Sequence, residues 1–107
     1  MGGREARAKA LISFRAAAVS EFAAAIDYYD REREGRGQRF AGEVERTLDV
    51  IALLPLAYPL LQAPDVRSAK VRYFPYRVVY VYVRGNVDVL AVAHAKRRAD
   101  YWHRRVP

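Results

Sequence analysis

The stretch from Lys70 to Arg105 constrains the fold more than any other part of the chain. It contains two runs rich in valine and tyrosine, 76–84 and 87–93, on either side of Gly85-Asn86. Valine and tyrosine favour strands, and a glycine–asparagine pair favours a two-residue hairpin turn. The sequence therefore predicts a β-hairpin here, preceded by another strand over 69–73.

Two helices are expected before this hairpin. Apolar side chains recur at helical spacing over 16–33 and over 38–54, and glycines separate the two segments. An apolar run over 9–14 predicts a first strand, and the proline-rich segment 55–65 predicts a loop. The expected order is β-α-α-β-β-β with a basic C-terminal tail. This is an α+β fold in which a helical hairpin packs on a small antiparallel sheet.

A chain of 107 residues predicts one domain over 1–107. We expect residues 1–8 to be flexible and 96–107 to form a basic, aromatic tail, as a short helix or an extended arm. The chain has no cysteine and only two histidines, and carries no cofactor motif, so we expect neither a metal nor a cofactor. No apolar run reaches the ~18–20 residues of a membrane span. We therefore expect no membrane association and a cytoplasmic location.

The net charge of +7 predicts an acidic partner: nucleic acid, an anionic surface or an acidic protein. Arginine greatly outnumbers lysine, and its planar fork suits phosphate and carboxylate groups. Four arginines crowd the end of the chain, which argues against a charge that serves solubility alone. They are Arg97, Arg98, Arg104 and Arg105.

A two-residue turn over 85–86 would set the register of the hairpin and place Arg77 opposite His94. A tight connection over 74–75 would add Arg72 and Lys70 to the same face. This cationic row could bind phosphate or a target. His94 could serve there as an acid, a base or a phosphate ligand, or could instead be a structural histidine that bonds backbone at a strand end.

The two faces of the hairpin differ in character. We expect the helices to cover the face with Tyr80 and Tyr82, because Asp88 and the cationic row on the other face are costly to bury. The other face would then expose an apolar patch suited to a protein partner, unless the loop 55–65 covers it. The members of this patch are Val79, Val81, Val83, Leu90 and Val92.

The aromatic pair Tyr101-Trp102 lies among the arginines of the tail. These rings could stack on nucleic-acid bases, or they could pin the tail onto the domain.

Over residues 11–105 the chain resembles the RelE/ParE superfamily of type II toxin–antitoxin toxins. The resemblance lies in the helical AAAIDYYDRE and FAGEVERTLDVIALLP, in FPYRVVYVY and in VLAVAHAKRRADYW. It implies a helical hairpin on an antiparallel sheet, and a growth-inhibiting toxin that a cognate antitoxin neutralises. The apolar patch would be the antitoxin-binding surface, because antitoxin segments are typically acidic and amphipathic.

The ending VLAVAHAKRR and the FPY segment look more like the ParE branch, whose members poison DNA gyrase and need no active site. Target-binding residues would then come from the basic end and the cationic row. They are Arg72, Arg77, His94, Arg97, Arg98 and Trp102.

RelE-type members instead cut mRNA in the ribosome, and this activity is the alternative. Lys70, Arg77, Arg97 and Tyr101 match catalytic positions of that branch. Ser68 stands where a second lysine is expected, which argues against a complete ribonuclease site. A second alternative is a non-toxic basic module that binds nucleic acid.

Overall fold

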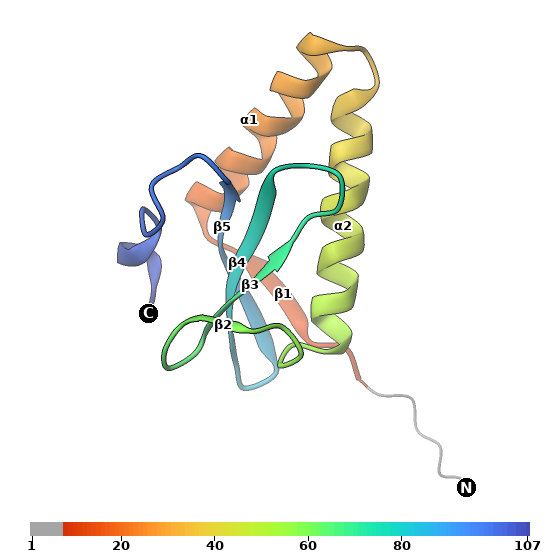
Figure 1. Cartoon of the computed structure of the whole chain (residues 1–107). Helices are drawn as coiled ribbons and strands as arrows, with labels where there is room; N and C mark the ends of the chain where they lie inside the picture. The colour runs from red at the N-terminus through yellow and green to blue at the C-terminus, as the bar shows by residue number, and fades with distance from the viewer. Residues whose placement is uncertain (1–7) are drawn as a thin grey trace, which may run out of the picture.

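The computed structural model describes residues 8–107, which form two helices packed on a five-stranded sheet (Figure 1). The chain runs through β1 (Leu11–Phe14), α1 (Ala16–Glu32), α2 (Arg36–Leu53), β2 (Leu60–Gln62), β3 (Val66–Lys70), β4 (Tyr76–Val83), β5 (Asn86–His94) and a 3₁₀ turn, η1 (His103–Arg105). The predicted α+β fold is confirmed. The flexible segment predicted for 1–8 lies, except for residue 8, outside the described residues. Neither helix of this described part is long and apolar enough to cross a membrane.

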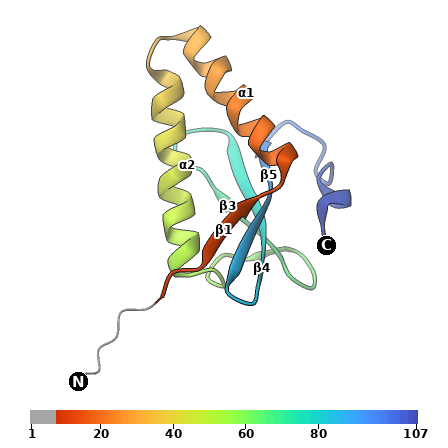
Figure 2. The same ribbon diagram turned by 180° about the vertical axis from the view of Figure 1, so that it is seen from behind.

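The strands lie in the order β1-β5-β4-β3-β2. β1 runs parallel to β5, whereas the other neighbours are antiparallel, so the sheet is mixed and not purely antiparallel. The helical hairpin explains this difference, because it returns the chain to the end of the sheet where β1 begins. There the N–H of Ala10 donates to the carbonyl of Ala52 at 2.9 Å. Figure 2 shows β1 beside β5, with the end of α2 close to the start of β1.

The strands on the far side of the sheet begin earlier than the sequence predicts. β2 lies inside the segment 55–65 that was predicted as a loop, and β3 begins at Val66, three residues before the expected start. The three prolines of this segment lie outside β2, which has only three residues. A strand this short leaves too brief an alternation of apolar and polar residues to be recognised.

The two helices approach each other most closely at Gly37, in the first turn of α2. A Cβ atom there would lie 2.5 Å from the carbonyl oxygen of Ile26 on α1. The Gly37 N–H also donates to Oδ1 of Asp30 at 2.8 Å, which satisfies one of the free N–H groups at the start of α2. Gly35, with φ +87°, makes the turn between the helices.

The β4–β5 turn is centred on Arg84 and Gly85, one residue earlier than predicted. Both have positive φ, +53° and +81°, as a type I′ hairpin turn requires. Val83 therefore pairs with Asn86, and a bulge farther along leaves Leu90 without a partner on β4.

Beyond the bulge, Arg77 pairs with Ala93 and Tyr76 pairs with His94. The predicted pairing of Arg77 with His94 is therefore wrong. The bulge inserts one residue, and a shift of one residue moves a strand side chain to the opposite face.

The helices cover the face of the sheet that carries Tyr80, as predicted. The tyrosine is fully buried, and its hydroxyl donates to the carbonyl of Pro55 at 2.7 Å. An aromatic cluster joins both helices to the β3–β4 turn, with ring centroids 4.8–5.3 Å apart in its closest pairs. Its members are Tyr29, Phe40, Phe74 and Tyr76.

The opposite face of the sheet is also covered, by the C-terminal tail. Trp102, which is 3% exposed, packs there in a second core, and Tyr101 and Val106 pack against its margin. We call this surface the tail face. Its buried sheet residues are Val66, Val79, Val81, Leu90 and Ala91.

The prediction of an exposed apolar patch on this side is wrong. Of its five residues only Val83 is exposed, at 48%, whereas Val79, Val81, Leu90 and Val92 are buried. The bulge moves Val92 into the core beneath the helices. The cover is the tail and not the loop 55–65, whose leucines remain exposed.

Candidate functional site

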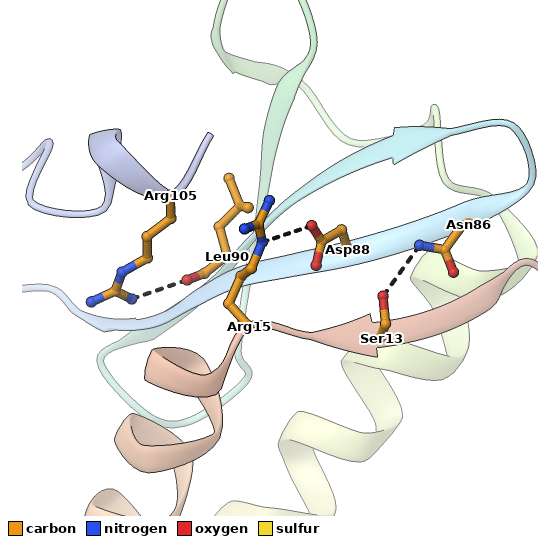
Figure 3. A network of polar contacts seen from close by, with 6 residues as sticks. All are labelled: Ser13, Arg15, Asn86, Asp88, Leu90 and Arg105. Carbon is orange, nitrogen blue, oxygen red and sulfur yellow. Dashed lines mark hydrogen bonds and ion pairs between the residues drawn. The ribbon is translucent and has the colours of Figure 1, made fainter. Parts of the chain in front are cut away.

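A polar network joins the tail to the outer edge of β5. β1 pairs with β5 only as far as Val89, so β5 continues beyond the end of its neighbour. The carboxylate of Glu21 on α1 accepts the N–H of Val92 at 3.1 Å and pairs with Arg105 at 3.1 Å. Arg105 also donates to the carbonyl of Leu90 at 3.0 Å, as Figure 3 shows. The network thereby satisfies backbone groups at the bulge and fastens the tail to the sheet.

Glu21 lies on α1 but is not a solvated charge of the helix surface. Its side chain is 17% exposed. A signal was available in the sequence, because Glu21 follows the buried Ala18 by three residues and precedes the buried Ala25 by four. This spacing places it beside the buried stripe of α1.

A second ion pair lies at the junction of β1 and α1. Arg15 Nε lies 2.9 Å from Oδ2 of Asp88 on β5 (Figure 3). Asp88 therefore has a partner at the margin of the tail face. This pair is partly exposed, so its contribution to stability is modest.

A hollow of about 340 Å³ lies between α1, the end of β5 and the tail. Arg97 covers one side of Tyr101, with its guanidinium carbon 3.8 Å from the ring centroid. Burial raises the pKa of Tyr101 to about 12, and the nearby Glu21 carboxylate adds to this effect. The phenol therefore keeps its proton near neutral pH and can donate a hydrogen bond but cannot act as a base. The polar residues around the hollow are Glu21, Tyr28, Tyr76, His94, Arg97 and Tyr101.

His94 ends β5 as a structural histidine. Its Nδ1 accepts the backbone N–H of Lys96 at 2.9 Å, and its ring packs edge-on against Tyr76 with the centroids 5.0 Å apart. These contacts match the structural alternative. The imidazole also borders the hollow.

The four residues that match ribonuclease positions form two separate pairs. Lys70 and Arg77 are exposed and lie opposite each other on β3 and β4. Arg97 and Tyr101 lie together at the hollow. Within residues 8–107, no hydrogen bond, ion pair or cation–π contact joins the two pairs.

Ser68 explains part of the environment of Arg77. The serine is 4% exposed, and its Oγ accepts a hydrogen bond of 2.8 Å from Arg77. A lysine at this position would place a second cation beside the arginine. The Ser68 hydroxyl therefore orients the Arg77 side chain through this hydrogen bond and adds no charge.

The remaining predicted target-binding residues are scattered. Arg72 lies in the β3–β4 turn, not opposite Arg77 as predicted, and its guanidinium covers the ring of Tyr73 at 4.8 Å. Arg98 is exposed and lies 3.4 Å from Asp100. Trp102 is buried, so it pins the tail and cannot stack on a base while the tail is docked.

The described part of the chain, residues 8–107, contains no group of three histidine, cysteine, aspartate or glutamate side chains that could hold a metal ion. Its functional groups are mainly arginines and tyrosines. The guanidinium groups of the arginines suit the binding of phosphate and carboxylate anions.

Solved structures with the same fold include two toxin structures. One is described as a chromosomal ParDE toxin–antitoxin system from P. aeruginosa: the TM-score is 0.72 at 10% identity, over 82% of this chain and 98% of that one. The other is a mutant of the E. coli toxin RelE in the free state, with a TM-score of 0.64 at 21% identity, over 91% of this chain and 93% of that one. At these identities the likeness establishes the fold alone.

The sequence itself matches a family model. No curated protein matches the sequence at a significant level. Residues 12–99, however, match the model described as the ParE toxin of the type II toxin–antitoxin system parDE. This match covers both helices and, except for Leu11 of β1, the five strands, so the chain belongs to the ParE toxin family of type II toxin–antitoxin systems.

Proposed function

We propose that this toxin inhibits growth by acting on DNA gyrase and that a cognate antitoxin neutralises it. The observation that carries the proposal is the family match over residues 12–99. The geometry supports it, because Lys70 and Arg77 lie opposite each other on β3 and β4, whereas Arg97 lies apart from them, over Tyr101. A protein that inhibits by binding needs no convergent acid and base.

The basic end of the chain is the proposed contact with gyrase. Arg97 and Arg98 lie just beyond β5 and are exposed, and His94 borders the same end. Lys70, Arg72 and Arg77 form the cationic part of the β3–β4 end.

A supercoiling assay tests this proposal. Purified toxin at micromolar concentration should reduce ATP-dependent supercoiling of a relaxed plasmid by gyrase. The double variant Arg97→Ala/Arg98→Ala should inhibit less, whereas Arg46→Ala, an exposed arginine on α2, should inhibit like the parent. Normal supercoiling at micromolar parent toxin would contradict the proposal.

The antitoxin needs a surface other than the buried tail face. Exposed leucines lie at the end of α2 and just beyond it, around a groove of about 320 Å³ that is lined mainly by apolar residues. We call this the leucine surface. Its members are Leu53, Leu54 and Leu56.

We infer that an amphipathic segment of the antitoxin binds the leucine surface. Tyr82 of β4 lines the same groove, so the sheet contributes an aromatic side chain to this surface. The surrounding chain is basic, with a net charge of +7, and favours an acidic partner.

Substitution of the leucine surface tests this inference. Leu54→Asp/Leu56→Asp should lose binding to the antitoxin encoded beside this gene, as measured by calorimetry. Val19→Asp, on an exposed α1 position, should bind normally. Equal affinities of the two variants would refute the assignment of this surface.

The ribonuclease alternative rests on one further observation. Lys70 and Arg77 are exposed, opposed cations on adjacent strands, and such a pair can hold a phosphate. If this activity exists, Arg77→Ala should abolish ribosome-dependent cuts in mRNA. A parent protein that leaves translated mRNA intact would exclude it. Growth arrest on expression would count against the second alternative, a non-toxic nucleic-acid-binding module.

A further inference from the structure

The tip of the helical hairpin carries a basic hollow that lies outside the surfaces described so far. Its volume is about 500 Å³. The turn between α1 and α2 forms one side, and the β3–β4 turn, which Figure 1 shows beside α2, forms the other. Its charged lining consists of three arginines and one carboxylate: Arg33, Arg36, Arg39 and Glu34.

The three arginines differ in how they are held. Arg36 lies over the rings of Tyr29 and Phe74, with its guanidinium carbon 5.1 and 6.0 Å from their centroids. It also reaches Glu32 at 3.5 Å. Arg33 and Arg39 are exposed and have no ion pair with any of residues 8–107. One guanidinium is thus fixed, and two are available to an anion.

Tyr73 stands at the rim of the same hollow in a strained conformation. Its φ is +70°, in the left-handed region that tyrosine rarely adopts, and 68% of it is exposed. The N–H of Val71 donates to the carbonyl of Tyr76 at 2.9 Å and closes the turn around it. This strained backbone conformation does not bury the tyrosine ring. Strain of this kind is concentrated at ligand-binding positions.

We propose that this hollow binds a single strand of nucleic acid. Arg33, Arg36 and Arg39 would take successive phosphates, and a base would stack on the exposed ring of Tyr73. A positive groove bordered by an aromatic ring is the arrangement that binds single strands without sequence preference. Arg72 covers one face of the Tyr73 ring. An acidic peptide would satisfy the arginines of the hollow but would leave the other face of the ring without a flat partner.

This site does not depend on the identity of the toxin's target. It would hold a DNA strand beside gyrase as readily as an mRNA strand. It also differs from the opposed pair of Lys70 and Arg77, because neither of these residues lines the hollow.

Fluorescence anisotropy with a labelled 12-nucleotide single-stranded DNA of mixed sequence tests the proposal, using the full chain over a range of KCl concentrations. Tyr73→Gly should weaken binding roughly 5- to 150-fold, the range expected for one stacked base. Glycine suits the positive φ, so this variant should fold at least as well as the parent. Tyr73→Phe should bind like the parent.

Salt dependence tests the arginines separately. On a single strand, each phosphate contact contributes about 0.7 to the slope of log K against log [salt]. Arg33→Ala/Arg39→Ala should therefore lower the slope by about twice that amount. Lys9→Ala removes a cation at the far end of the molecule and should leave the slope unchanged.

Three results would overturn the proposal. The parent could fail to bind the oligonucleotide at 50 mM KCl. Tyr73→Gly and the double arginine variant could bind as the parent does, which would place any affinity elsewhere. A polyglutamate peptide of equal charge could compete as well as the oligonucleotide, which would indicate an acidic protein partner.

Discussion

Removal of the Trp102 side chain should cost the protein a large part of its stability. A buried tryptophan takes roughly 150–250 Å² out of water, which at about 25 cal/mol per Å² corresponds to about 4–6 kcal/mol. Measured truncations of buried aromatic residues cost about 3–5 kcal/mol. In the variant the tail can also detach from the sheet, so the loss of stability cannot exceed the free energy with which the tail binds the sheet. We therefore expect Trp102→Ala to lower the free energy of unfolding by about 3–5 kcal/mol, out of the 5–15 kcal/mol typical of a domain.

Urea denaturation followed by circular dichroism measures this change. The parent offers a second probe, because Trp102 is its only tryptophan and its fluorescence reports the tail directly. If the tail is part of the cooperative unit, fluorescence and circular dichroism should give the same midpoint. His103→Ala, at an exposed position in the adjoining η1 turn, is the matched control and should change stability by less than about 0.5 kcal/mol.

A loss below about 1 kcal/mol in Trp102→Ala would refute the reasoning, because a side chain 3% exposed cannot be removed so cheaply from a packed core. A fluorescence transition well before the circular dichroism transition would show that the tail undocks separately. The tail would then contribute little to the stability of the sheet.

Three further predictions concern other parts of the fold. Gly37→Ala should lower the free energy of unfolding, measured by urea denaturation, by about 1–3 kcal/mol, because its Cβ would meet a carbonyl oxygen of α1. Gly42→Ala, on the open face of the same helix, should be neutral or should stabilise the protein by up to about 1 kcal/mol. Glu21→Gln should lower the free energy of unfolding by about 1–2 kcal/mol, because it weakens the ion pair with Arg105 of the tail. Glu45→Gln, at an exposed position of α2, should lower it by less than about 0.5 kcal/mol, and equal losses in the two variants would contradict the role of the ion pair. Burial raises the pKa of Tyr80 to about 12 from 10 in the unfolded chain, so its contribution to stability is complete below pH 10 and is lost as the pH rises toward 12. This loss reaches about 1.4 kcal/mol at pH 11, and Tyr80→Phe should remove that part of the alkaline slope.

The helices could be predicted from the sequence because their signals are local. The apolar stripe of α1 and the glycines after it are separated by only a few residues, and the structure places both helices within two residues of the expected bounds. The face of the hairpin that the helices cover was also predicted correctly. The turn lies one residue earlier than predicted, which moves each pairing partner near the turn by two residues. Because side chains alternate with a period of two, this change leaves the same side chains on the same face.

The register of the hairpin could not be derived in the same way. A type I′ turn fits several neighbouring dipeptides, and Arg84 adopts positive φ although Asn86 tolerates it more readily. The bulge at Leu90 leaves a carbonyl that Arg105 satisfies from fifteen residues away. Such a long-range contact leaves no periodic pattern in the sequence.

The candidate site was predicted in composition but not in arrangement. The arginines and tyrosines were identified, yet the grouping of Arg97 with Tyr101, apart from Lys70 and Arg77, depends on the path of the tail. That path follows from Trp102, whose burial the sequence left as one of two alternatives.

The position of β5 in the sheet has a consequence for biosynthesis. β5 is the last strand to be made, yet it pairs with the first strand, β1, and separates it from β4. Until residues 86–89 of β5 have emerged from the ribosome, β1 has no partner in the sheet, and the two helices have only part of their core to cover. The pairing of β1 with β5, two strands far apart in the sequence, raises the contact order of the fold, and non-local pairing slows folding. The nascent chain therefore cannot complete its sheet until β5, the last of the five strands to be made, is available.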